Sequence, residues 1–308
     1  MSQSVYSEVG RIVAVGDLHG NYAGFKRILQ EAGLIDKRGH WKAKDTHLVQ
    51  LGDILGRGGE PGKIFKLLRR LEAEAPQYGS RVHVLLGNHE AMSMSGLIVY
   101  NTMEEFQDLA GEDLLEAGAE FPDPVPARGK RSELDAKLSK RLDMLGCREF
   151  RAALSPRGKV GGWLVVHDSA VVINGNLFVH GGLNREYGFM PLPELNHRVR
   201  LELCDDGASN PGKDVMLRRD GPQWNREYTL KANDDRRREL VEVLDYHHCL
   251  RMVVGHTPTS CIDPQRAGRI LPMYDEKMFC IDTGIGKTYG GNLSALNWER
   301  GEVSALYF

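Results

Sequence analysis

In the first hundred positions, short continuous runs of apolar residues alternate with segments in which apolar residues recur at helical spacing. Three short runs of aliphatic and β-branched residues predict buried strands: 11–15, 47–51 and 82–86. Two segments between them carry apolar residues at helical spacing: 22–32, which ends at Gly33, and the stretch that begins at Pro61. Strands that alternate with helices in this way predict an α/β fold with an at least partly parallel sheet.

The pattern changes character in the middle of the chain and then returns to strands. Residues 101–160 are predicted to form a mainly helical insertion, but the prolines of 121–129 forbid a continuous helix there. The proline-rich part either covers a functional site of the protein or is a plain connector. Strands are predicted at 163–173, 177–180, 250–254, 279–281 and 293–296, with a helix over 234–249. We therefore predict a single domain over 1–308.

Composition narrows the class of protein. The chain has 308 residues, of which 41% are hydrophobic and 27% charged, as in soluble globular proteins. A net charge of -2 gives no electrostatic footprint for nucleic acid or an anionic membrane, and no apolar run approaches the ~18 residues of a membrane span. The N-terminus shows no signal peptide, and five scattered cysteines fit reduced thiols, so we expect a cytoplasmic protein. Nothing in the sequence encodes an oligomeric state.

Polar residues able to bind metal follow several of the predicted strands, each within a Gly-rich loop. These residues are Asp17, His19, Asp53, Asn88, His180 and His256. Loops at strand ends can converge at one sheet edge, held by a rigid scaffold. The pattern therefore predicts one polar site assembled from distant parts of the chain.

The residue types suit a pair of divalent cations about 3.5–4 Å apart, which can activate water and hold both oxygens of a phosphoryl displacement. Asp17 and His19 could bind one ion and Asp53 could bridge. Asn88, His180 and His256 could complete the second ion. Carboxylate, imidazole and amide ligands favour Mn²⁺, with Fe or Zn²⁺ as alternatives.

Three further residues have the chemistry that a phosphoryl group needs. Arginine offers a forked donor that matches phosphate, and Arg57 and Arg226 are the candidates. His89, next to the predicted ligand Asn88, is placed to protonate the leaving oxygen as general acid. Asp282, after a predicted strand, either supports the site or is structural. His247 and His248 are interpreted as structural or solvated residues at a helix end.

Taken together, the motifs resemble the phosphoprotein phosphatase branch of the calcineurin-like metallophosphoesterase superfamily. The matching motifs are Gly16-Asp17-Leu18-His19-Gly20, Gly87-Asn88-His89-Glu90 and His180-Gly181-Gly182. The sequence between the motifs resembles that of the Shewanella-like protein phosphatases. The resemblance implies a four-layer sandwich of two mixed β-sheets flanked by helices, with a dinuclear site at the sheet-edge loops. It implies hydrolysis of phosphomonoesters on phosphoserine, phosphothreonine or phosphotyrosine, or on small phosphoesters, by direct attack of a metal-bridging hydroxide.

Position 56 departs from the family pattern. The second motif of the family carries an aspartate there that orients the acid histidine, and this chain has Gly56. The same aspartate is missing in diadenosine-tetraphosphate hydrolases of the superfamily, so a dinucleoside polyphosphate hydrolase is the alternative enzyme. A metal-binding, phosphate-sensing module with weak activity is the alternative from another class. We do not expect cysteine-based phosphatase chemistry, because no cysteine lies in a Gly-rich, Arg-ended phosphate loop.

Overall fold

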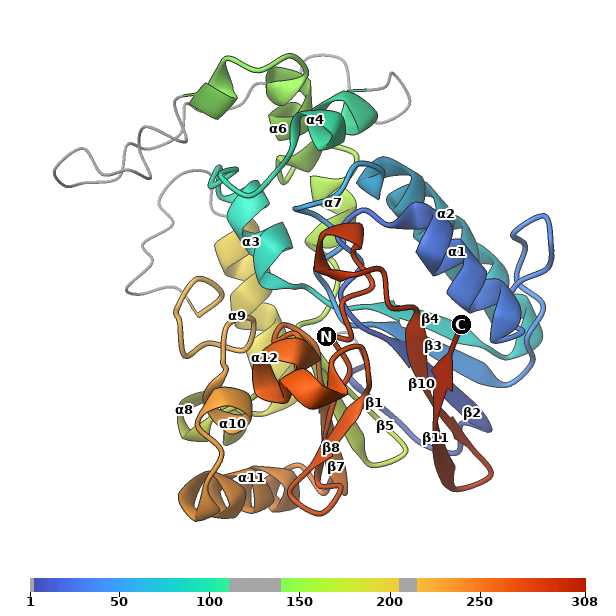
Figure 1. Cartoon of the computed structure of the whole chain (residues 1–308), viewed down its shortest axis with the longest axis vertical. Coiled ribbons are helices and arrows are strands. Elements are labelled where there is room, and N and C mark those ends of the chain that lie inside the picture. The colour runs from blue at the N-terminus through green and yellow to red at the C-terminus, as the bar shows by residue number, and fades with distance from the viewer. Residues whose placement is uncertain (1–2, 111–139, 205–214) are drawn as a thin grey trace, which may run out of the picture.

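The computed structural model describes residues 3–110, 140–204 and 215–308 and confirms the predicted fold class (Figure 1). Two mixed sheets lie face to face between layers of helices. One sheet has the order β1-β5-β6-β7-β9-β8, made of β1 (Val5–Tyr6), β5 (Ala170–Ile173), β6 (Asn176–Val179), β7 (Arg251–Val254), β9 (Met278–Cys280) and β8 (Leu271–Met273). The other has the order β11-β10-β2-β3-β4, made of β11 (Glu302–Tyr307), β10 (Ser294–Glu299), β2 (Arg11–Val15), β3 (Thr46–Gln50) and β4 (Arg81–Val84).

Parallel pairing brings the motif-bearing loops to one edge. β2, β3 and β4 are mutually parallel, so their carboxyl ends and the loops that follow them lie side by side. In the other sheet β6, β7 and β9 are also parallel. The hairpin that joins β5 to β6 turns at Asn174 and Gly175, whose φ values of 49° and 71° are those of the predicted two-residue turn.

Alternation along the strands builds the core. In β2, Ile12 and Ala14 join the core between the sheets together with Phe178 of β6. The intervening Val13 and Val15 belong to the core on the helix side. Both faces of this strand are buried, which explains why its sequence is a continuous apolar run.

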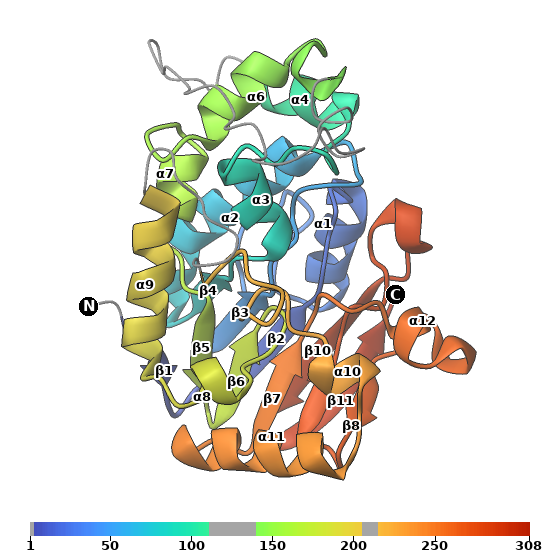
Figure 2. The same cartoon turned by 90° about the vertical axis from the view of Figure 1, so that its left-hand side faces the viewer.

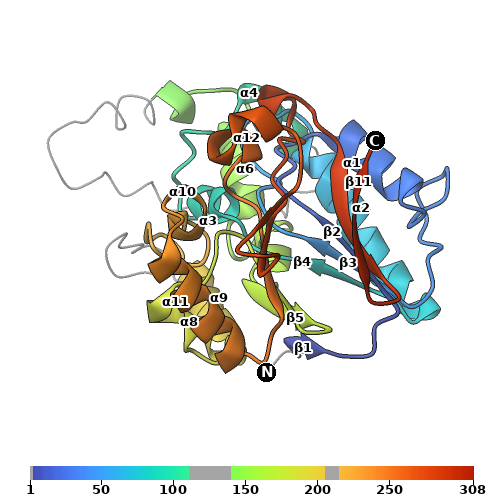
Figure 3. The same ribbon diagram turned by 60° about the horizontal axis from the view of Figure 1, so that its bottom comes forward.

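Helices cover the outer faces of both sheets. They are α1 (Tyr22–Glu31), α2 (Pro61–Glu74), α3 (Asn88–Met94), α8 (Arg185–Gly188), α9 (Leu192–Cys204), α10 (Glu227–Leu230), α11 (Asp234–Tyr246) and α12 (Thr259–Ile262), with 3-10 turns at Ala75–Tyr78, Pro264–Arg266 and Lys287–Tyr289. Figure 3 shows α1 and α2 on one side of the sheets and α9 and α11 on the other. The Asn21 side chain caps α1 by accepting from the Gly24 amide, and Pro61 opens α2, as the sequence predicts. Within the described residues no helix combines the length and apolarity needed to cross a bilayer.

The predicted strand over 163–173 is wrong in its first part. Helix α7 (Gly161–Leu164) occupies its start, and β5 begins only at Ala170. The Trp163 ring packs edge-on against Phe65 of α2 at 5.7 Å, and its indole N–H donates to Glu72. This packing against α2 outweighs the local preference of the aromatic and β-branched residues for a strand.

The described parts of the predicted insertion contain α4 (Met103–Leu109) and α6 (Cys147–Leu154). They pack together through Phe106 and Phe150, whose ring centroids are 4.9 Å apart. Figures 1 and 2 place both helices above α3, beyond the loop edge of the sheets. The proline-rich segment 121–130 lies outside the described residues. The domain boundaries stay a prediction.

Candidate metal centre

Within each sheet, backbone hydrogen bonds join neighbouring loops at this edge. The amides of Leu18 and His19 both donate to the Asp53 carbonyl, at 3.0 and 2.9 Å. In the other sheet, the Gly255 amide donates to the His180 carbonyl at 2.9 Å. The six predicted ligands all come from these loops and all are buried: Asp17, His19, Asp53, Asn88, His180 and His256. Bulkier residues would disturb this packing, since a Cβ at Gly52 would lie 2.4 Å from the Gly87 nitrogen.

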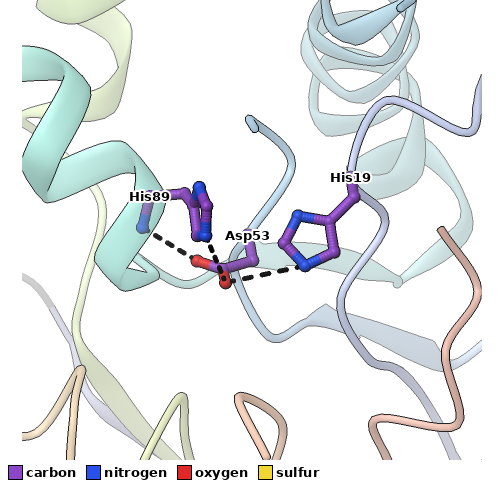
Figure 4. A group of neighbouring side chains, drawn as sticks. All are labelled: His19, Asp53 and His89. Atoms are coloured by element: carbon purple, nitrogen blue, oxygen red, sulfur yellow. Dashed lines mark hydrogen bonds and ion pairs between the residues drawn. The ribbon is translucent and has the colours of Figure 1, made fainter. Parts of the chain in front are cut away.

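Asp53 lies at the middle of the cluster. Its Oδ2 is 3.9 Å from the Nε2 atoms of both His19 and His89, as Figure 4 shows. Its Oδ1 accepts from the His89 amide at 3.0 Å and lies 3.3 Å from His180 Nε2. The carboxylate therefore faces both groups of side chains that could hold an ion, one with His19 and His89 and one with His180 and His256. This is the position that a bridging ligand requires.

Asn88 and Asp17 complete the set that the sequence predicts. The Asn88 Oδ1 atom lies 3.1 Å from His180 Nε2, on the Asp53 side of the imidazole. The two oxygens of Asp17 both accept from the His256 amide at 3.1 Å, and Asp17 Oδ1 is 4.0 Å from His180 Nδ1. Asp17 is thus tied to the loop after β7 as well as to its own.

Two imidazoles of the cluster, those of His180 and His19, have a backbone carbonyl behind them. His180 Nδ1 is 2.7 Å from the Leu51 carbonyl, and His19 Nδ1 is 3.0 Å from the Gly56 carbonyl. A ring N–H that donates to such a carbonyl leaves the lone pair on Nε2, which in both residues faces Asp53. Metal-binding histidines are commonly oriented in this way, so the residues present fit a metal ion.

His256 has two possible partners that exclude each other. Its Nε2 atom is 3.1 Å from the Trp224 carbonyl, which needs a proton on Nε2, and 2.9 Å from Arg226 Nε, which needs a lone pair there. With the proton on Nε2, the lone pair is on Nδ1 and is available to a metal. Arg226 then loses the imidazole as its acceptor, and its Nε–H can donate to an anion instead.

The buried carboxylates of the site favour binding of a positive charge, either a proton or a cation. Burial raises the pKa of Asp17 well above its usual value, and neighbouring Asp282 adds to the effect. Burial also raises the pKa of Asp282, which is therefore electrostatically part of the site. Burial alone would lower the pKa of His180, but Asp53 and Asp17 outweigh it and raise the pKa to about 10. A proton on His180 Nε2 thus stands where a cation would bind.

Loading the metal-free protein with Mn²⁺ is therefore expected to release about one proton at pH 7.5. A pKa near 10 leaves His180 protonated at that pH, and the imidazole must lose this proton before it can act as a ligand. Affinity should then tighten by about tenfold for each pH unit from 6 to 9. Titration calorimetry in PIPES and in Tris measures the released proton through the difference in observed enthalpy. Equal enthalpies in the two buffers would contradict the assignment.

Glu90 is a residue of the site to which the sequence assigned no role. Its side chain is fully buried and accepts from four backbone amides: Asp53 and Gly87 to one oxygen, Ile54 and Leu55 to the other, at 2.8 to 3.0 Å. Burial and the nearby Asp53 raise the pKa of Glu90 to about 7, against these four donors. The carboxylate shapes the loop after β3 and so fixes the position of Asp53, whose φ of 52° is in the left-handed region.

His89 packs directly on Gly56. A Cβ at position 56 would lie 2.0 Å from His89 Nδ1, and the φ of Gly56 is 78°, so no side chain fits there. Burial lowers the pKa of His89 to about 3, which leaves the imidazole neutral at pH 7 in the metal-free chain. Neither ring nitrogen forms a hydrogen bond with the part of the chain that the structure describes.

Arg57 presents its guanidinium at the same site. The group lies over the Tyr100 ring, 4.5 Å from the centroid, and its buried Nε atom has no hydrogen-bond partner among the described residues. Donors left free beside buried imidazoles are suited to a phosphate. By contrast, His247 and His248 lie at the end of α11, outside the cluster, as interpreted from the sequence.

Comparisons with known proteins agree with this geometry. The calcineurin-like phosphoesterase family model matches residues 10–260. The chain is 35% identical over 310 residues to Shewanella-like protein phosphatase 2 of Arabidopsis thaliana, with 92% of this chain and 74% of that protein covered. It is 26% identical over 283 residues to Shewanella-like protein phosphatase 1 of Plasmodium berghei, with 90% and 67% covered. The solved cold-active protein tyrosine phosphatase of a psychrophilic Shewanella shares the fold, with a TM-score of 0.75 at 22% identity over 100% of this chain and 82% of that one.

Proposed function

The chain belongs to the calcineurin-like phosphoesterase family, and within it to the Shewanella-like protein phosphatases; it is a metal-dependent phosphoester hydrolase, and we propose that it dephosphorylates phosphoserine, phosphothreonine or phosphotyrosine in proteins. The observation that supports this most is the buried cluster around Asp53, in which three imidazoles are backed by carbonyls. Both relatives are named as protein phosphatases. The protein substrate is our proposal.

Two divalent ions are proposed, one held by Asp17, His19 and Asp53, the other by Asp53, Asn88, His180 and His256. When bound, such ions supply an activated water and neutralise the charge of the phosphoryl group. We propose Mn²⁺, with Fe or Zn²⁺ as alternatives, because the ligands combine carboxylate, imidazole and amide. The phosphoryl group then passes to water without a covalent link to the protein. A single catalytic domain and a cytoplasmic location remain part of the proposal.

Arg57 and Arg226 are proposed to hold the phosphoryl oxygens from two sides. Arg57 Nε has no partner among the described residues, and Arg226 becomes available when His256 donates to the Trp224 carbonyl. His89 is proposed to donate its proton to the leaving oxygen. A dianionic phosphate beside the ring raises the pKa of the imidazole and so favours the protonated form that an acid needs.

Hydrolysis of p-nitrophenyl phosphate tests the enzyme assignment. Protein freed of metal by EDTA should be inactive, and Mn²⁺ should restore turnover at least about 100-fold above the metal-free rate. The control is the same protein with Ca²⁺, which prefers an all-oxygen ligand shell. If no metal in a series of Mn²⁺, Fe²⁺, Zn²⁺ and Co²⁺ supports turnover, the alternative of a phosphate-sensing module replaces the enzyme.

A comparison of substrates, with the same Mn²⁺-loaded protein, tests the substrate class. Phosphopeptides that carry Ser, Thr or Tyr are compared with diadenosine tetraphosphate at equal concentration, with released phosphate or nucleotide as the readout. We expect the phosphopeptides to have the higher kcat/KM. A preference for the dinucleotide by orders of magnitude would replace the protein-phosphatase proposal with the polyphosphate hydrolase that Gly56 raised as the alternative.

A further inference from the structure

Position 56 offers no carboxylate that could orient the proposed acid His89 or the proposed phosphate-binding residue Arg57. The His89 ring rests on the Gly56 backbone with no room for a side chain between them. Arg57, next in the chain, has a φ of 72°, which is uncommon for a residue with a Cβ. Contacts from outside the loop must fix the Arg57 backbone, because such a conformation persists only when its surroundings hold it.

Tyr100 contacts both residues. Its carbonyl accepts from the Arg57 amide at 3.2 Å, and its ring lies under the guanidinium at 4.5 Å. The same ring is 5.6 Å from the His89 imidazole, centroid to centroid. A tyrosine ring under a guanidinium attracts it through the negative face of the ring and limits its rotation. The phenol is 40% exposed, so the ring forms a wall of the site rather than part of the core.

The segment that carries Tyr100 is itself fixed to the loop. Glu105 is fully buried, and its carboxylate accepts from the Gly56 amide and from the Thr102 amide at the start of α4. Thr102 Oγ1 in turn accepts from the Glu105 amide, which closes a capping box. Gly56 and Arg57 are therefore bonded, one residue after the other, to Glu105 and Tyr100. Four residues from two distant segments are thus bonded into one unit.

We infer that Tyr100 is a positioning residue for Arg57 and His89, and that Glu105 fixes it against the loop in place of a carboxylate at position 56. The inference rests on the proposed function, since it assigns Arg57 to phosphate binding and His89 to proton donation. It also explains how an active enzyme can carry glycine at position 56.

Binding of inorganic phosphate to the Mn²⁺-loaded protein, measured by calorimetry, tests the part that acts through Arg57. Tyr100→Leu should weaken phosphate binding about fivefold to tenfold, and Tyr100→Phe, which keeps the ring, should restore most of the loss. Arg57→Lys removes the planar group that stacks on the ring. The double variant Tyr100→Leu/Arg57→Lys should therefore bind phosphate no more weakly than Arg57→Lys alone. Tyr78→Leu, at a tyrosine with a similar 38% exposure outside the site, should bind like the parent.

Rates on two esters test the part that acts through His89. A general acid matters more for a poor leaving group, so Tyr100→Leu should lose about tenfold more kcat on phenyl phosphate than on p-nitrophenyl phosphate. Equal losses on the two esters, or losses in phosphate affinity that multiply in the double variant, would overturn the inference. If the parent hydrolyses neither ester, the proposed function fails, and the phosphate-binding comparison still decides the role of Tyr100.

Discussion

Asp53→Asn is expected to lower kcat by about 10³-fold or more, which corresponds to about 4 kcal/mol of transition-state stabilisation. The carboxylate faces both candidate ion sites, with Oδ2 3.9 Å from His19 Nε2 and Oδ1 3.3 Å from His180 Nε2. An amide keeps one oxygen but replaces the other with an NH₂ group, which has no lone pair for a metal. One of the two ions loses its shared ligand, and the site keeps excess positive charge.

The fold should survive this substitution, so that a loss of activity reports on metal binding and not on unfolding. The Asp53 carbonyl still accepts from Leu18 and His19, and the amide oxygen can still accept from the His89 amide. Elemental analysis after gel filtration should show about half the metal of the parent, and thermal unfolding reports folding. Asp275→Asn is the matched control, because that side chain is 83% exposed on a surface turn. Parent-like activity in Asp53→Asn would mean that the site has been assigned to the wrong residues.

The six candidate ligands could be predicted from the sequence because each lies within a few residues of the end of a strand. Apolar runs locate the strands, parallel pairing brings their ends together, and a Gly-rich loop leaves room for the polar residue. Asp17 and His180 are 163 positions apart, yet the structure places them 4.0 Å from each other. The family resemblance, confirmed by the comparisons, rests on the same loops.

The residues that hold the ligand-bearing loops in place could not be predicted from the sequence in this way. Tyr100 and Glu105 lie in the region interpreted as an insertion, and their contacts with Arg57 and Gly56 follow no local spacing. Trp163 is a similar case, because its packing on α2 replaces a strand with a helix. Local patterns report which side chains are apolar and where backbone can turn. They do not report which distant donor a buried carboxylate will meet.

Glu90→Ala is expected to destabilise the protein by about 4 kcal/mol and to lower its Tm by about 10 °C. Four amides lose their acceptor inside the protein, and a buried donor without a partner costs about 1–3 kcal/mol before any relaxation. Water can enter the space left by the side chain and offset part of that total. Glu90→Gln should lose less, because its carbonyl oxygen can still accept from one pair of donors, while its NH₂ faces the other pair.

The substitution also separates structure from ligation at this site. Glu90 touches no candidate ion position, but it holds the amides of Asp53, Ile54 and Leu55, so its loss frees the loop that carries the bridging carboxylate. Metal affinity should therefore fall in Glu90→Gln together with stability, whereas Asp53→Asn should lose metal with little change in Tm. Glu31→Gln, at a 45% exposed glutamate on α1, is the control for the charge alone. If Glu90→Gln unfolds like the parent and binds Mn²⁺ equally well, the four amides do not depend on this carboxylate, and the loop must be held by the backbone bonds to Leu18 and His19 instead.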